Sequence, residues 1–134
     1  MTTFHELLSM QRKTRKSPSD EEHKIQTTCV KWFNITHPQL KGLLFAVPNG
    51  GRRDKVTAAK MKAEGVVAGV ADLILLVPNK THAALLIEMK TKTGKQSPSQ
   101  KNWQKGLNPI YKYVLCRSLE DFMREVNNYI NDSI

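Results

Sequence analysis

The chain has 134 residues and a formal net charge of +9, from 21 Lys and Arg against 12 Asp and Glu. This length suits one domain with a substantial core, and the positive charge favours a polyanionic partner, most often nucleic acid. No stretch is long and apolar enough for a transmembrane helix, and residues 1–10 lack the basic start and apolar core of a signal peptide. We therefore expect a cytoplasmic protein without a membrane partner, in the host cytoplasm if the source is viral or phage-like. Cys29 and Cys116 fall in a predicted helix and a predicted strand, which favours reduced core thiols.

The first 19 residues are expected to form a basic, flexible arm. Its basic residues, Arg12, Lys13, Arg15 and Lys16, lie just before a Ser-Pro-Ser sequence. A run of this kind is usually a solvated tail, and its functional version would contact phosphates. A single domain is then expected over residues 20–134.

The first helix is predicted to start at Ser19 and to end before Pro38. Ser19 and Glu22 have the spacing of a capping box. Its apolar stripe repeats at helical spacing and consists of Ile25, Cys29, Trp32 and Phe33. Glu22 and Gln26 lie one turn apart on a neighbouring face. Capping alone would explain Glu22, and a solvent-facing amide would explain Gln26.

A short strand over residues 43–47 and a helix over residues 54–64 are predicted next. Between them lie Pro48-Asn49-Gly50-Gly51 and the basic residues Arg52 and Arg53. Glycine backbone beside guanidinium groups suits close approach to a phosphate, although the same glycines are common in plain turns.

The central feature is a predicted β-hairpin over residues 69–90. Two apolar runs flank a turn-rich, five-residue connection. The runs span residues 73–77 and 83–87. Antiparallel pairing would bring Asp72, just before the first strand, close to Glu88, near the end of the second. Because successive strand residues alternate between faces, Glu88 and Lys90 are expected on the same face.

The charges at the open end of this hairpin allow two interpretations. Glu88 and Lys90 could form an ion pair where the strand reaches solvent, which would satisfy both charges. Alternatively, Asp72 and Glu88 could hold a divalent cation together with the backbone carbonyl of Met89, because hard cations take carboxylate and carbonyl oxygens. The spacing alone leaves both open.

The rest of the chain predicts a helix, a strand and a final helix. A basic loop with Lys92 and Lys95 leads to Ser97-Pro98-Ser99-Gln100, where Gln100 has the capping-box position of the next helix. Its amide could equally point back to the strand that carries Lys90. A strand is predicted over residues 111–116 and a helix from residue 118. The element order predicts an α/β domain with a mixed sheet of about four strands flanked by helices.

Five motifs, in this order, resemble the VRR-NUC family of the PD-(D/E)XK nuclease superfamily. They are Glu22-x-x-x-Gln26, Pro48-Asn49-Gly50-Gly51, Gly69-x-x-Asp72-Leu73, Glu88-x-Lys90 and Ser97-x-x-Gln100-x-x-Trp103. The resemblance implies a restriction-endonuclease-like fold. One departure is visible: Ala71 stands where the family has a proline before Asp72, and it concerns the local turn, because that proline supplies no ligand.

The resemblance also implies a function, a metal-dependent and structure-directed DNA endonuclease that acts as a homodimer, with branched or four-way junction DNA as the expected substrate. Asp72, Glu88 and the Met89 carbonyl would bind Mg²⁺ or Mn²⁺. Catalytic roles are implied for Asp72, Glu88, Lys90 and Gln26, with Glu22 and Gln100 as supporting candidates. The expected DNA contacts are Asn49, Arg52, Arg53, Lys60, Lys92 and Lys95. The alternative is a nucleic-acid-binding or assembly module that keeps the nuclease fold and does not cut.

Overall fold

The computed structural model describes residues 3–6, 18–48 and 54–132. Its elements are α2 (Pro18–Thr36), the 3₁₀ helix η1 (Pro38–Leu40), β1 (Leu44–Ala46), α3 (Lys55–Ala63), β2 (Leu73–Leu75), β3 (Ala84–Met89), α4 (Pro98–Lys105), β4 (Tyr111–Cys116) and α5 (Leu119–Asn131). Each predicted helix and strand is therefore found. α2 begins at Pro18, earlier than the predicted cap at Ser19, because the fixed φ of proline suits the first turn of a helix.

The strands form one four-stranded sheet in the order β1-β2-β3-β4. β1 and β2 pair antiparallel, as do β2 and β3, whereas β3 and β4 are parallel. The sheet is thus mixed, as predicted. The parallel pair needs a crossover, which α4 provides.

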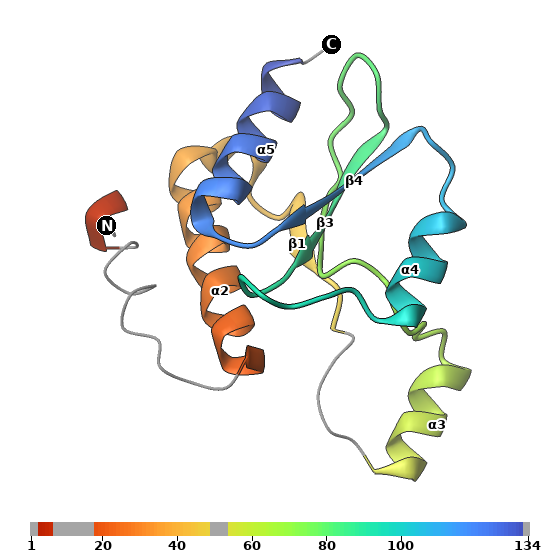
Figure 1. Cartoon of the computed structure of the whole chain (residues 1–134). Helices are drawn as coiled ribbons and strands as arrows, with labels where there is room; N and C mark the ends of the chain where they lie inside the picture. The colour runs from red at the N-terminus through yellow and green to blue at the C-terminus, as the bar shows by residue number, and fades with distance from the viewer. Residues whose placement is uncertain (1–2, 7–17, 49–53, 133–134) are drawn as a thin grey trace.

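The two faces of the sheet are covered differently. α2 and α5 lie side by side on one face and α4 covers the other (Figure 1). Within β3, Leu85, Ile87 and Met89 belong to the large cluster with α2 and α5. Ala84 and Leu86 face α4 in a smaller cluster with Trp103 and Tyr113. Because side chains alternate along a strand, Glu88 lies on the α4 face.

The turn of the central hairpin is fastened to the C-terminal end of α5. The buried Asn79 accepts hydrogen bonds at Oδ1 from the backbone N–H groups of Thr81 and His82, at 3.0 and 2.7 Å. Its Nδ2 donates to the carbonyl of Tyr129 at 3.2 Å. This far end of the hairpin is therefore fixed, and the carboxylates stand at the opposite, open end.

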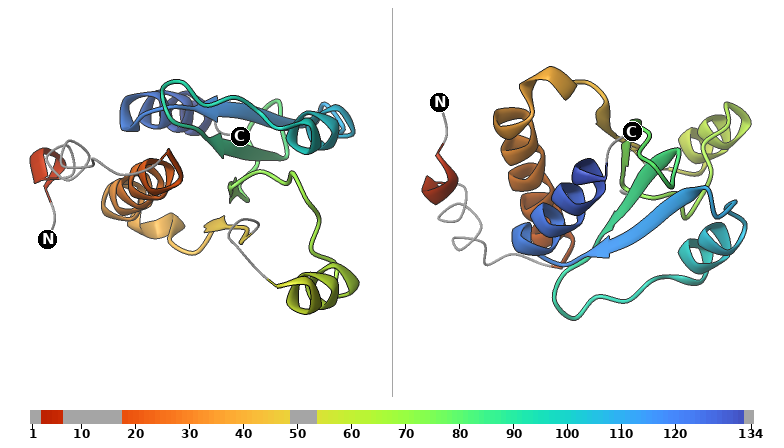
Figure 2. Two further views of the ribbon diagram at one scale, coloured as in Figure 1. Left: turned by 60° about the horizontal axis from the view of Figure 1, so that its bottom comes forward. Right: turned by 90° about the horizontal axis from the view of Figure 1, so that it is seen from above.

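None of the residues of α3 is buried. Both views in Figure 2 place it away from the sheet. Its start is fixed locally, since Asp54 Oδ1 accepts a hydrogen bond from the backbone N–H of Thr57 at 2.6 Å.

Cys29 and Cys116 are free and fully buried in the large core cluster, as predicted. Burial raises the pKa of both thiols. Among the helices that the structure describes, none has the length and hydropathy to cross a membrane.

Candidate active site

The open end of the hairpin brings Asp72 and Glu88 together. Leu73 pairs with Ile87, so Asp72, one residue earlier, faces the stretch of β3 that begins at Glu88. The backbone N–H of Met89 donates to Asp72 Oδ2 at 2.7 Å. In an extended strand the N–H and C=O of one residue point to the same side. The Met89 carbonyl therefore projects toward the edge at which Asp72 lies.

Glu88 is fully buried, with no exposed surface. Its Oε1 accepts hydrogen bonds from Gln96 Nε2, at 3.1 Å, and from the hydroxyl of Tyr113. Its Oε2 is buried and has no hydrogen-bond partner among the described residues. One oxygen of this carboxylate is thus held by two donors, while the other is left for a ligand outside the chain.

The ion pair between Glu88 and Lys90, one of the two interpretations of these charges, is not found among the described residues. Within the described residues the ion pairs are those of Arg124 with Asp121 and Glu125. The physical reason is that Glu88 is fully buried at this strand end, where neutral donors from the following loop and from β4, Gln96 and Tyr113, hold its Oε1. Lys90 is half-buried and its backbone N–H donates to the carbonyl of Cys116 at 2.9 Å.

The charged groups at this end influence one another. Burial raises the pKa of Asp72, the negative charge of Glu88 raises it further, and the hydrogen bond from Met89 and the charge of Lys90 oppose the rise. Burial likewise raises the pKa of Glu22, with Lys90 opposing and Asp72 and Glu88 adding to the rise. Three carboxylates and one ammonium thus share one electrostatic environment.

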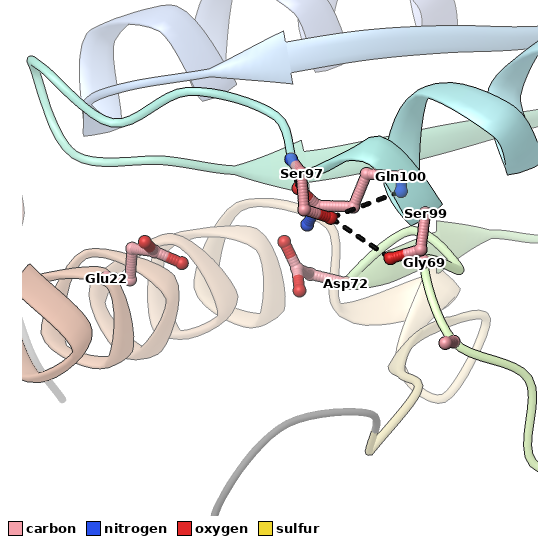
Figure 3. A pocket seen from close by; sticks show the side chains of 7 residues that line it. Glu22, Gly69, Asp72, Ser97, Ser99 and Gln100 are labelled. Atoms are coloured by element: carbon pink, nitrogen blue, oxygen red, sulfur yellow. Dashed lines mark hydrogen bonds between the residues drawn. The ribbon is translucent and has the colours of Figure 1, made fainter.

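A cavity of about 280 Å³ opens between α2, the segment before β2 and the start of α4. Its lining consists of Glu22, Ala68, Gly69, Asp72, Ser97, Ser99 and Gln100. In Figure 3 the carboxylates of Glu22 and Asp72 point into the same space, with Ser97 and Gln100 on its other side. Gln26, one turn after Glu22, is half-buried and is not part of this lining.

Gln100 fulfils its predicted role as a cap. Its Oε1 accepts from the backbone N–H of Ser97 at 2.8 Å, and Ser97 Oγ accepts from the backbone N–H of Gln100 at 3.2 Å (Figure 3). The amide that reaches the strand belongs instead to Gln96, which bridges Glu88 and Gln104.

The wall between the cavity and α4 depends on Gly69, which is buried and has φ of +87°. A Cβ at this position would overlap the carbonyl oxygen of Ser99 and would lie 2.8 Å from Gln100 N, closer than Cβ atoms approach. Only glycine therefore lets the segment before Asp72 lie directly against the start of α4.

The loop after Lys90 is fastened by Arg117, which follows β4. One guanidinium nitrogen, Nη1, donates to the carbonyls of Thr91, Lys92 and Gly94 at 2.7, 3.2 and 2.6 Å. A residue far along the chain therefore fixes the conformation of this loop. Gln96, near the end of the loop, lies within hydrogen-bond distance of Glu88.

The predicted DNA contacts fall into two groups. Lys60, Lys92 and Lys95 are exposed, on α3 and on the loop after Lys90. Asn49, Arg52 and Arg53 lie outside the described residues, as do the basic residues of the predicted arm.

The donor set fits a hard divalent cation. Among the described residues no three His, Cys, Asp or Glu side chains form a group that could hold a metal. The protein would contribute two carboxylates, Asp72 and Glu88, and the Met89 carbonyl, which suits Mg²⁺ because this ion usually takes one or two carboxylates and keeps several waters. Oε2 of Glu88, buried and without a partner, is the oxygen most in need of such a ligand.

The domain has a mixed β-sheet flanked by helices, with Asp72 just before β2 and a Glu-x-Lys sequence at the end of β3. This combination is the arrangement of a nuclease-like domain. The model of the VRR-NUC domain matches residues 20–118, and the chain belongs to this family, which is related to nucleases. A solved structure named VRR_NUC domain protein is similar with a TM-score of 0.66 and 24% identity, covering 84% of this chain and 89% of that chain. At this identity the likeness shows the fold. No curated protein matches the chain significantly.

Sequence reasoning missed Gln96, Tyr113 and Arg117. The sequence indicates Gln96 only weakly, through its place in the loop that follows Lys90. Tyr113 and Arg117 have none, because their contacts with Glu88 and with the loop join residues 23–26 positions apart.

Proposed function

We propose that this protein is a metal-dependent endonuclease that hydrolyses phosphodiester bonds in DNA. The observation that carries the proposal is Glu88, a fully buried carboxylate with one oxygen held by two neutral donors and the other without a partner. A buried charge of this kind is costly unless a cation compensates it. The nearby Asp72 and the Met89 carbonyl would complete the protein ligands of Mg²⁺ or Mn²⁺.

The proposed mechanism assigns a task to each residue. A bound divalent cation would polarise the phosphate and lower the pKa of a water. Asp72 and Glu88 would hold the cation in position, and the burial of Glu88 would shield the cation from bulk solvent. Lys90 stabilises the negative charge that builds on the phosphoryl oxygens or orients the water. Glu22, on α2, lines the cavity that would receive the reacting water and phosphate. Gln26, one turn later on the same helix, would assist from outside this lining.

Exposed lysines would hold the DNA backbone outside the site. Lys60, Lys92 and Lys95 would contact phosphates, together with Asn49, Arg52, Arg53 and the basic arm. Such contacts make binding strongly salt-dependent, since each neutralised phosphate adds about 0.9 to the slope of log K against log salt. Deleting residues 1–16 should therefore weaken binding and flatten this slope, and unchanged binding across a salt series would mean that the arm is only a solvated tail.

We further propose a homodimer and branched or four-way junction DNA as the substrate, both from the family resemblance. Exposed apolar residues on and after α3 support the dimer, namely Val56, Val66 and Val67. Val56→Glu should lower the mass measured by sedimentation. Wild-type protein that sediments as a monomer at all concentrations would exclude the dimer.

The decisive test is cleavage of linear, flapped and four-way junction DNA with Mg²⁺, Mn²⁺ or a chelator. Glu88→Ala and Lys90→Ala should each lower the rate at least about a hundredfold, whereas the exposed controls Glu120→Ala and Lys105→Ala should not. If Glu88→Ala cuts as well as wild type, the catalytic assignment is wrong. Wild-type protein that binds DNA without metal-dependent cleavage would favour the non-cutting module.

A further inference from the structure

We propose that Tyr113 is a positioning residue for Glu88. Its hydroxyl, together with the Gln96 amide, holds Oε1 so that Oε2 is the oxygen presented to the cation. This inference rests on the proposed function, because it assigns a role toward the metal that the endonuclease would bind. It adds a residue from β4, a strand that carries none of the sequence-predicted site residues.

The register of the parallel strands explains how Tyr113 reaches Glu88. Tyr113 pairs with Leu86, and Leu115 pairs with Glu88. Leu86 and Glu88 lie on the same face of β3, about 6.6 Å apart along the strand at roughly 3.3 Å per residue. A tyrosine is long enough to cross this distance diagonally, and its hydroxyl meets Oε1 of Glu88. A shorter polar residue at this position would not reach.

Both donors are themselves held in place by α4. The ring of Tyr113 packs against that of Trp103, with centroids 6.3 Å apart and planes at 54°. Gln96 Nε2, which donates to Glu88, also donates to Gln104 Oε1 at 2.8 Å. α4 therefore fixes the two side chains that fix Glu88, and the carboxylate orientation is set before any cation arrives.

The chemistry of the donors suits a metal ligand. Tyr113 donates through its neutral phenol hydroxyl, and Gln96 through its neutral amide. A neutral donor orients a carboxylate without cancelling its charge, whereas a lysine or arginine would compete with the cation. Hydrogen-bonded partners of metal ligands commonly change metal affinity 10–100-fold when removed.

The same strand offers a matched control. Tyr111, at the start of β4, is 42% exposed and lies two residues from Tyr113. Each Tyr→Phe change removes one hydroxyl and keeps the ring. Only the change at 113 removes a donor from Glu88.

The test measures Mn²⁺ binding to the full chain by electron paramagnetic resonance, without DNA. Tyr113→Phe should weaken binding about 10–100-fold, while Tyr111→Phe should bind as wild type does. Mn²⁺ should also perturb the tyrosine ultraviolet band of wild type and of Tyr111→Phe, but not of Tyr113→Phe. Melting curves without metal establish that the variants fold. Should Tyr113→Phe not fold, Gln96→Met removes the other donor and should weaken Mn²⁺ binding in the same way.

The outcomes separate the two proposals. Wild-type affinity in Tyr113→Phe would overturn the positioning role and leave the endonuclease proposal intact. The same result in Gln96→Met would overturn the role of the donor pair. Wild-type protein that binds no Mn²⁺ at millimolar concentration would overturn the metal-dependent function itself, and the positioning role with it.

Discussion

Gly69→Ala is the change whose effect can be worked out most fully from the structure. A residue with a Cβ pays roughly 1–2 kcal/mol for a left-handed backbone, and Gly69 has φ of +87°. The added Cβ would also lie 2.5 Å from the carbonyl carbon of Ser99, which is backbone and cannot swing away. Overpacking of this kind costs roughly 1–3 kcal/mol. The sum is roughly 2–5 kcal/mol, relieved only if α4 moves away from the segment before Asp72.

Gly65→Ala separates the two costs. Gly65 has φ of +104°, but a Cβ there would meet nothing within 4 Å. Gly65→Ala therefore has the backbone cost alone. Both variants reduce the conformational entropy of the unfolded chain in the same way, so this effect cancels when they are compared. For a chain of this size 1 kcal/mol lowers the melting temperature by roughly 3–5 °C, so Gly69→Ala should melt at least about 3 °C below Gly65→Ala.

The assay is thermal unfolding followed by circular dichroism, with chelator present, and Mn²⁺ binding by the same two variants. Gly69→Ala should also bind Mn²⁺ more weakly than Gly65→Ala, because α4 carries the supports of Glu88. Equal melting temperatures would refute the close approach of Gly69 to Ser99. A lower melting temperature with unchanged Mn²⁺ binding would refute the link between α4 and the site.

Three further predictions concern other parts of the fold. Arg117→Lys keeps the positive charge but loses the planar guanidinium donor. Amide hydrogen exchange in residues 91–96, measured by NMR, should therefore become about tenfold faster or more. Unchanged exchange would show that the loop conformation does not depend on Arg117. The hydrogen bond from Thr57 lowers the pKa of Asp54 in the folded state. Such a group stabilises the fold at pH values above its unfolded-state pKa, and this stabilisation is lost as the pH falls through its folded-state pKa. Acidification from about pH 6 to about pH 3 should therefore fray α3 in wild type more than in Asp54→Asn, which caps without titrating; equal loss of helical signal would contradict this. Leu85→Ala should cost about 2–5 kcal/mol in urea unfolding, against about 0.5 kcal/mol or less for the exposed Leu76→Ala.

The parts of the fold that local pattern controls were predicted well. The strand over residues 111–116 matches β4, and the Ser97 capping box is present with both of its hydrogen bonds. Apolar alternation and caps act within a few residues, so the sequence displays them directly. The first strand of the hairpin is shorter than predicted and ends at Leu75, although the backbone N–H of Leu76 still donates to the carbonyl of Leu43 at 2.8 Å.

The site was predicted only in part, for a physical reason. The hairpin places Asp72 beside Glu88 through local pairing, which spacing can reveal. The solvation of Glu88 is not local, since its donors come from a loop and from a strand 25 residues later. The alternative of an ion pair with Lys90 assumed that the strand ends in water. Glu88 is instead fully buried, and no periodicity in the sequence indicates this burial.

The position of β4 in the chain has a consequence for biosynthesis. Both carboxylates leave the ribosome well before Tyr113 and Arg117, and the hairpin that carries them can pair early because its contacts are local. Burial of Glu88 has to wait until the crossover through α4 is complete and β4 has docked in parallel. A nascent or truncated chain that ends before residue 111 would hold the acidic pair with Glu88 lacking one of its two donors. Assembly of the proposed metal site is thus a late step, which would delay the proposed nuclease activity until nearly the whole domain has been made.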